Sequence, residues 1–194
     1  MYEKIFDINV LHNAQSVRIW TINREEADMK GYAKKKQKFP QKVMVWLGVC
    51  SKGITPLVTL DKGTVNHKIY IEKILHVALK YGNHVFVNNW IFQQDGATAH
   101  THHLSQKCCI DNFPAVIEKD HWPSNRTNLN PLDYFIWDEF VQQIKWEKVH
   151  SMKTLIDELK HAVKRIRLEK VLESCMCWTN RLFRMCENNG NYLH

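Results

Sequence analysis

Long hydrophobic runs are missing from this sequence of 194 residues. The longest apolar run, residues 43–50, is far shorter than the roughly 20 residues of a membrane helix. Glycine and proline are scarce, at 7 and 5 residues, which excludes collagen-like and low-complexity chains. Residues 1–7 also lack the basic start and apolar stretch of a secretory signal. The sequence therefore predicts a globular protein that is made in the cytosol and has no membrane partner.

Cysteine and histidine do not form a zinc pattern. The six cysteines include the close pairs Cys108–Cys109 and Cys175–Cys177, whose spacing differs from that of zinc-binding pairs. His100 and His103 would share one face of a helix, but no suitably spaced cysteine or carboxylate accompanies them. A cytosolic chain of this length needs no disulfides, so we expect reduced, buried thiols.

Basic residues outnumber acidic ones by 27 to 20, giving a net charge of +7. Such a charge favours polyanionic partners and points to nucleic acid. The densest basic segment, which we call the lysine patch, contains Lys34, Lys35, Lys36 and Lys38. It is interpreted as a solvated loop, as a phosphate-contacting loop or as a nuclear-import signal.

The first half of the chain has the pattern of a β-sheet followed by a helix. Residues 5–10 and 16–22 predict a hairpin, and residues 43–50 predict a strand that is buried on both faces and central in the sheet. Residues 54–60 can return as a further strand. Residues 66–80 repeat their apolar positions near every 3.6 residues, which predicts an amphipathic helix ended by Gly82.

The second half alternates short strands with helices. Residues 85–87, 90–92 and 115–117 predict strands, and residues 99–109 predict a helix. Helices are expected to start at Asn130-Pro131 and at Ser151, and a last one spans residues 169–186. We find no repeat and no composition boundary. This order predicts one α/β domain, residues 1–194, with helices on both faces of the sheet and a helical C-terminus.

Two aspartates stand where this fold class places functional groups. Asp95 follows a predicted buried strand, and Asp133 lies in the first turn of a predicted helix. Two convergent carboxylates can bind Mg²⁺ or Mn²⁺ together with substrate phosphates. Each aspartate alone also has a structural interpretation: Asp95 as a turn residue before Gly96, and Asp133 as a partner of the helix dipole.

The segments around both aspartates carry a family resemblance. Residues 92–100 (FQQDGATAH), 122–124 (WPS) and 129–137 (LNPLDYFIW) closely resemble the second and third catalytic blocks of mariner-type transposases. Residues 43–49 and 51–53 resemble the central strand of that family. The resemblance spans essentially the whole chain.

The resemblance implies a ribonuclease H-like domain with a mixed sheet flanked by helices. Such a domain holds Mg²⁺ or Mn²⁺ with three carboxylates, and it cuts and joins DNA by a two-metal mechanism. Asp95 and Asp133 correspond to two of these carboxylates, with the 37 intervening residues of one subgroup. His100 matches a family histidine expected near them, in contact with phosphate. DNA as partner, a nuclear location, a candidate homodimer and no small-molecule substrate follow from the same resemblance.

The first catalytic position departs from the family pattern. Tyr2 stands where the family has Asp, and Glu3 is expected to point to the opposite face of the strand. The resemblance therefore implies a degenerate centre that binds metal weakly. Two alternatives stay open: a working nuclease that uses Asp7 or Glu3, and a retained protein-interaction module. The family's helix-turn-helix DNA-binding region has no counterpart here, so a truncated transposase descendant is expected.

Overall fold

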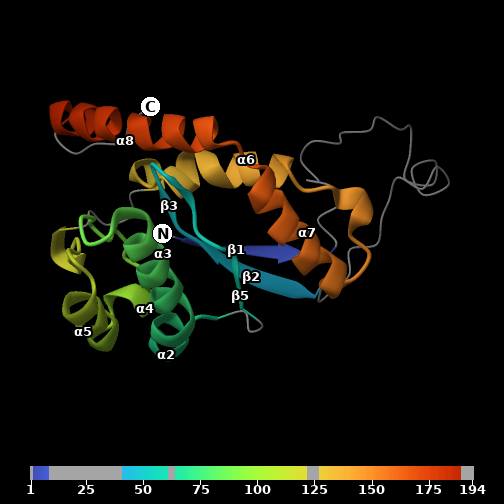
Figure 1. Cartoon of the computed structure of the whole chain (residues 1–194), viewed down its shortest axis with the longest axis horizontal. Helices are drawn as coiled ribbons and strands as arrows, with labels where there is room; N and C mark the ends of the chain where they lie inside the picture. The colour runs from blue at the N-terminus through green and yellow to red at the C-terminus, as the bar shows by residue number, and fades with distance from the viewer. Residues whose placement is uncertain (1, 9–40, 61–63, 122–126, 189–194) are drawn as a thin grey trace, which may run out of the picture.

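The computed structural model describes residues 2–8, 41–60, 64–121 and 127–188 (Figure 1). A three-stranded antiparallel sheet with the order β1-β2-β5 lies in the middle of the molecule. Its strands are β1 (Tyr2–Asp7), β2 (Lys42–Leu47) and β5 (Val58–Leu60). The prediction that residues 43–47 form the central strand is confirmed. Of the predicted hairpin, the first arm belongs to β1, and residues 16–22 lie outside the described residues, as does the lysine patch.

The predicted strand over residues 43–50 is interrupted at Gly48. The Gly48 N–H donates to Oγ1 of Thr55 at 2.8 Å, and the Thr55 N–H donates back to the Gly48 carbonyl at 2.9 Å. This reciprocal pair separates β2 from a small hairpin of β3 (Val49–Cys50) and β4 (Gly53–Ile54). The chain therefore leaves the central strand three residues earlier than the apolar run suggests.

The sheet divides the hydrophobic core into two halves. Val43, Val45 and Leu47 of β2 pack with Phe6 against the C-terminal helices. Trp46 faces the opposite half, together with Leu60 of β5 and the helices that follow it. Both faces of β2 are therefore covered by helices, as the continuous apolar run predicts.

The first helical layer begins at Asn66, whose side-chain oxygen accepts a bond from the Ile69 N–H. It consists of α2 (His67–Ile69), a π-helical segment η1 (Tyr70–Leu75) and α3 (His76–Phe86). The predicted end at Gly82 is wrong, because the helix continues to Phe86 and Gly82 is buried against the Trp90 ring. Residues 85–86 consequently form the last helical turn, and the predicted strand there is absent from the described chain.

The segment after α3 makes only one strand-like contact. Phe92 and Val116 form a single parallel bridge, in which the Phe92 N–H donates to Ala115 at 2.8 Å and the Ile117 N–H donates to Phe92 at 2.9 Å. The predicted strands at 90–92 and 115–117 are reduced to this bridge. Two short helices, α4 (Thr98–Thr101) and α5 (His103–Asn112), replace the one predicted, because His102 is extended.

The C-terminal part supplies the second helical layer. It contains a π-helical segment η4 (Leu132–Ile136), α6 (Trp137–Gln142), α7 (Met152–Arg165) and α8 (Leu168–Glu187). Short 3₁₀ turns η2 (Lys119–His121), η3 (Thr127–Leu129) and η5 (Trp146–Lys148) connect the elements. The predicted starts at Asn130 and Ser151 are confirmed, and Ser151 forms a capping box with Thr154.

Two further sequence expectations can be compared with the described chain. None of its helices is long and apolar enough to cross a membrane. The six cysteines are free thiols, but the expectation that they are buried holds only for Cys109: Cys50, Cys108 and Cys175 are partly buried, and Cys177 and Cys186 on α8 are exposed.

We predict that Gly82→Ala destabilises the fold. A methyl group at Gly82 would overlap the Trp90 ring, so we expect the free energy of unfolding to fall by about 1–3 kcal/mol, although alanine favours a helix by about 1 kcal/mol. Urea denaturation measures the change. Gly96→Ala is the matched control, because nothing lies within 4 Å of the added methyl group. Equal stability of the two variants would show that the contact with Trp90 is unimportant.

Candidate metal and nucleic-acid site

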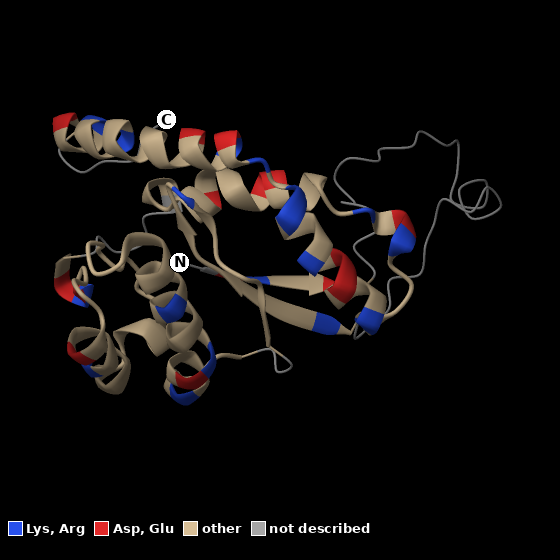
Figure 2. Ribbon diagram, in the orientation of Figure 1, with Lys and Arg blue, Asp and Glu red and all other residues tan. Residues whose placement is uncertain are grey.

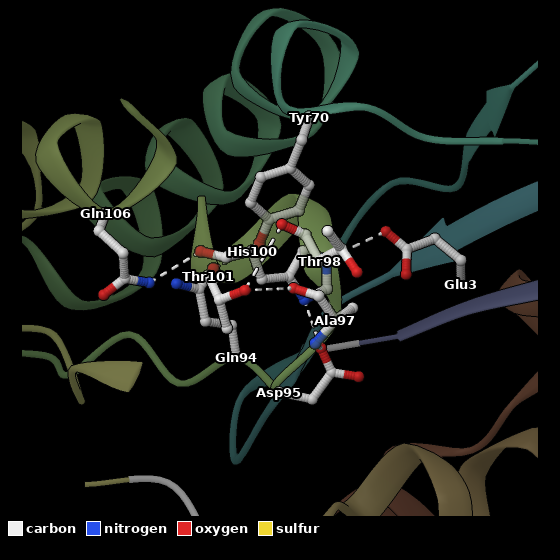
Figure 3. Close-up of polar contacts among 9 residues, drawn as sticks. All are labelled: Glu3, Tyr70, Gln94, Asp95, Ala97, Thr98, His100, Thr101 and Gln106. Carbon is white, nitrogen blue, oxygen red and sulfur yellow. Dashed lines mark hydrogen bonds and ion pairs between the residues drawn. The ribbon is translucent and has the colours of Figure 1, made fainter. Parts of the chain in front are cut away.

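Asp95 stands at the end of the segment that carries the Phe92–Val116 bridge, and it is 9% exposed. Its Oδ1 atom accepts a bond from the Ala97 N–H at 3.0 Å. This local bond turns the chain into α4, which brings His100 back onto the same carboxylate (Figure 3). The turn interpretation of Asp95 is therefore correct, and it also explains how Asp95 and His100 are brought together.

His100 connects the two sides of the site. Its side chain is 0% exposed, with Nδ1 bonded to Asp95 and Nε2 lying 3.2 Å from Oε1 of Glu3 on β1 (Figure 3). Burial alone would lower the pKa of His100, but its bonds to Asp95 and Glu3 raise that pKa above the usual value. Burial would likewise raise the pKa of Asp95, but the bond and charge of His100 lower it. The imidazole therefore favours its charged form between two carboxylates.

Tyr70 and Gln94 form the wall behind His100. The Tyr70 hydroxyl donates to Oε1 of Gln94 at 2.7 Å, and its ring lies 4.2 Å from the His100 ring. Burial, the largest effect, raises the pKa of Tyr70 well above its usual value, so the phenol stays neutral. The Gln106 amide holds the His100 carbonyl at 2.8 Å. The Tyr70 ring thus contacts the imidazole, and the Gln106 bond fixes the backbone of His100.

Asp133 approaches from the other helical layer. It lies in η4, whose first turn is fixed when the Asn130 side chain accepts a bond from the Leu132 N–H at 3.1 Å. Burial, the largest effect, and the charge of Asp95 together raise the pKa of Asp133 to about 6. Its Oδ2 atom is buried without a hydrogen-bond partner among the described residues. An ionised oxygen that has no hydrogen-bond partner and is repelled by the charge of a second carboxylate is suited to a hard cation.

The site offers two carboxylates rather than three. Within the described ranges, no group of three His, Cys, Asp or Glu side chains has a geometry that could hold a metal ion. Asp95 and Asp133 are the two carboxylates that could help to hold one Mg²⁺ or Mn²⁺ ion, with water or phosphate oxygens as its other ligands. Glu3 is nearby, but its carboxylate contacts the imidazole of His100.

The structure brings some of the predicted site residues together and leaves others apart or outside the described chain. It brings Asp95, His100 and Asp133 to one region, whereas the lysine patch lies outside the described residues. The phosphate contact predicted for His100 does not fit, because the side chain is buried and both ring nitrogens are occupied. Tyr2 pairs with Leu47 in the sheet. Asp7 lies at the other end of β1, about 13 Å from Glu3 along the strand.

Sequence reasoning missed Tyr70, Gln94 and the role of Glu3. Gln94 directly precedes Asp95, so its position was a usable signal. Tyr70 lies on a helix 25 residues before Asp95 and looked like an ordinary core residue. The bond between Glu3 and His100 spans 97 residues and has no local signature.

Comparison with known proteins identifies the fold. No family model and no curated protein sequence matches the chain. Among solved structures, the mixed α/β fold of this chain is similar to the ribonuclease H-like fold of a transposase catalytic domain. The particular match is the catalytic domain of Mos1 mariner transposase, with a TM-score of 0.67 and 17% identity, covering 79% of this chain and 77% of that one. The predicted fold class is confirmed.

Two larger Mos1 structures match as well. The paired-end complex with the left transposon end gives a TM-score of 0.74 at 15% identity, covering 100% of this chain and 55% of the other. The paired-end complex with Mn gives 0.70 at 18% identity, covering 84% and 48%. The chain spans about half the length of these transposase chains. At such identities the likeness shows a shared fold.

We predict that Asp133→Asn stabilises the protein at alkaline pH. In the folded protein the carboxyl of Asp133 is ionised above its pKa of about 6, and in the unfolded chain it is ionised above pH 3.8. Its charge therefore destabilises the fold fully above pH 6 and not at all below pH 4. After allowance for solvent screening, we expect a gain of about 1–2 kcal/mol at pH 8.

Urea denaturation at pH 8 and pH 4 measures this difference. Asp138→Asn, at an exposed position on α6, is the control and should change stability by less than about 0.5 kcal/mol. A loss of stability in Asp133→Asn at pH 8 would contradict a strained carboxylate.

Proposed function

We propose that this chain is a transposase-derived, DNA-binding domain that holds a Mg²⁺ or Mn²⁺ ion weakly and cleaves DNA poorly or not at all. The observation that carries the proposal is the electrostatic repulsion between Asp95 and Asp133, which come from different helical layers, together with one buried oxygen of Asp133 that has no hydrogen-bond partner among the described residues. The nuclear location belongs to the same proposal, because DNA is the partner.

The likeness to Mos1 supports the chemical class. Mos1 has been solved in complexes with a transposon end, and with Mn and Mg. In this chain Asp95 and Asp133 match the family's catalytic blocks, and the charge of Asp95 also acts on Asp133. A divalent cation between them would polarise a phosphodiester and activate water or a DNA 3′-hydroxyl.

The missing third carboxylate supports the loss of activity. A neutral phenol at Tyr2 is a poor ligand for Mg²⁺, and Glu3 is engaged with His100. An ion held by two carboxylates keeps mostly water ligands, so its affinity is low and its position is loosely fixed. Both effects weaken in-line attack.

A working nuclease is the second candidate function. It is favoured by the chain of contacts from Glu3 through His100 to Asp95, which places a third carboxylate next to the two proposed ligands. Rotation of Glu3 away from the imidazole would free it for a cation. Asp7, at the other end of β1, is a less suitable third ligand than Glu3.

We predict that the chain does not nick supercoiled plasmid in Mn²⁺ above background, and that Tyr2→Asp raises nicking. A restored carboxylate returns charge stabilisation of several kcal/mol, roughly a hundredfold in rate. Gel assays of nicked circles measure the rate, and water-proton relaxation in a Mn²⁺ titration measures metal binding. Asp95→Asn should weaken Mn²⁺ binding in either background.

The matched controls separate the two candidates. Tyr2→Asn changes the same position without adding a charge, and Tyr2→Asp combined with Asp95→Asn should be inactive. Nicking by the unmodified chain that Asp95→Asn abolishes would instead favour the working nuclease. Loss of that nicking in Glu3→Gln would then identify Glu3 as the third ligand.

We predict that DNA binding depends on the lysine patch. Replacing Lys34, Lys35, Lys36 and Lys38 by alanine should flatten the slope of log K against log salt by about 0.9 for each DNA phosphate that is no longer neutralised. Fluorescence anisotropy with duplex DNA at several salt concentrations measures the slope.

An equal charge change elsewhere is the control. Lys107, Lys148, Lys153 and Lys160 are exposed, and their replacement by alanine removes the same charge. If both quadruple variants flatten the slope equally, the effect belongs to the net charge and not to the lysine patch.

A further inference from the structure

Three histidines gather where α2 meets the start of α5, and we call them the histidine cluster. The ring centres of His67 on α2 and of His102 lie 3.8 Å apart, with an angle of 4° between the ring planes. The ring of His103 lies 4.4 Å from that of His102. His67 and His102 are half-buried, and His103 is exposed. The described residues include no three-ligand metal geometry, so the cluster needs another explanation.

His102 caps the first turn of α5. Its backbone is extended between α4 and α5, and its Nδ1 atom accepts a bond from the Leu104 N–H at 3.2 Å. An accepting Nδ1 atom has no proton, so the neutral ring carries its proton on Nε2. Protonation would place a second N–H opposite the N–H of Leu104 and would thereby remove the cap.

The surroundings of His102 also oppose a positive charge. The ring lies at the N-terminus of a ten-residue helix, where the helix dipole disfavours cations. Among the described residues, no carboxylate forms an ion pair with the histidine cluster. Partial burial, followed by the charges of His67 and His103, lowers the pKa of His102 below its usual value of 6.5. The folded chain therefore favours the neutral ring.

The remaining charged groups on the elements that pack around His102 are not among the causes of this shift (Figure 2). They are Lys68 on α2, Glu72 and Lys73 on η1, His100 on α4, and the ion pair of Lys107 with Asp111 on α5. The charges that face His102 are thus those of the histidine cluster itself.

His100 is only two residues away from His102, but its titration has the opposite sign. The folded pKa of His100 is raised, so its contribution to stability is complete below pH 6.5 and is lost as the pH rises through the folded pKa. The folded pKa of His102 is lowered, so its contribution is complete above pH 6.5 and is lost as the pH falls through the folded pKa. A loss of order in mild acid therefore points to His102 and not to His100.

We infer that His102 is an acid-sensitive switch: its neutral ring caps α5 next to His67, and its protonation releases the first turn of α5. That turn leads to Gln106, whose amide donates to the His100 carbonyl at 2.8 Å and whose Oε1 atom accepts a bond from the Lys119 N–H at 3.3 Å. We expect release of the turn to loosen both attachments. The inference depends on neither metal binding nor DNA binding.

Amide hydrogen exchange of the full chain at about pH 7.5 and about pH 5.5 tests the inference. After correction for the intrinsic pH dependence of exchange, the protection of amides 104–108 should fall roughly three- to tenfold in acid, as expected for the loss of an N-cap. The first turn of α7 is the internal control, because its cap, Ser151, does not titrate. Nitrogen NMR of the imidazole should find the proton on Nε2 at the higher pH.

Three variants separate the cap from its titration. His102→Asn retains an accepting oxygen that cannot be protonated, so the protection of the α5 turn should be equal at both pH values. His102→Ala removes the acceptor, so protection should be low at both. His161→Asn, at an exposed position on α7, is the matched control and should keep the acid response of the unmodified chain. Circular dichroism checks that each variant is folded.

Three results would overturn the inference. Equal protection of the α5 turn at both pH values in the unmodified chain would show that acid does not release the cap. A loss in acid that persists in His102→Asn would assign the titration to another group. An equal loss in the first turn of α7 would indicate general acid unfolding.

Discussion

Burial of β2 on both faces is the constraint on which the rest of this structure depends. Val45 and Leu47 need one apolar layer and Trp46 needs another, so helices must cover the sheet from both sides. The chain satisfies this by building one layer before residue 121 and the other after residue 127. Asp95 belongs to the first layer and Asp133 to the second. The charges of the two carboxylates interact because the same strand holds both layers in place.

One carboxylate of the site lowers the stability of the fold. An ionisable group that is buried without a full set of partners lowers stability, and Asp133 is such a group. Asp95 differs, because His100 compensates its charge. The imidazole is in turn positioned by Tyr70 and by the carboxylate of Glu3. One carboxylate is thus supported by a buried network, whereas the other has a buried oxygen without a hydrogen-bond partner among the described residues.

Local geometry deviates from regular structure around this site. Asp133 lies in a π-helical segment, and Tyr70 begins another. Such segments often occur at functional sites, because the wider turn redirects a side chain. The bridge between Phe92 and Val116 stands where two longer strands were expected, and a single bridge is enough to bring Asp95 to the end of its segment. Positioning of the carboxylates therefore relies on helix geometry and side-chain bonds more than on a wide sheet.

The sequence by itself determined the layered α/β class, the central strand, the starts of the helices at Asn66, Asn130 and Ser151, and the identity of both aspartates. These features have local causes, namely apolar runs, capping residues and short motifs. Only the tertiary structure decided that the helix continues past Gly82, since packing against Trp90 outweighs the helix-ending tendency of glycine. The tertiary structure also decided that the His100 imidazole bonds to the carboxylate of Glu3, because that bond joins residues 97 positions apart in the sequence. Contacts between residues so far apart in the sequence depend on how the helical layers pack on the sheet, and no local sequence pattern predicts them.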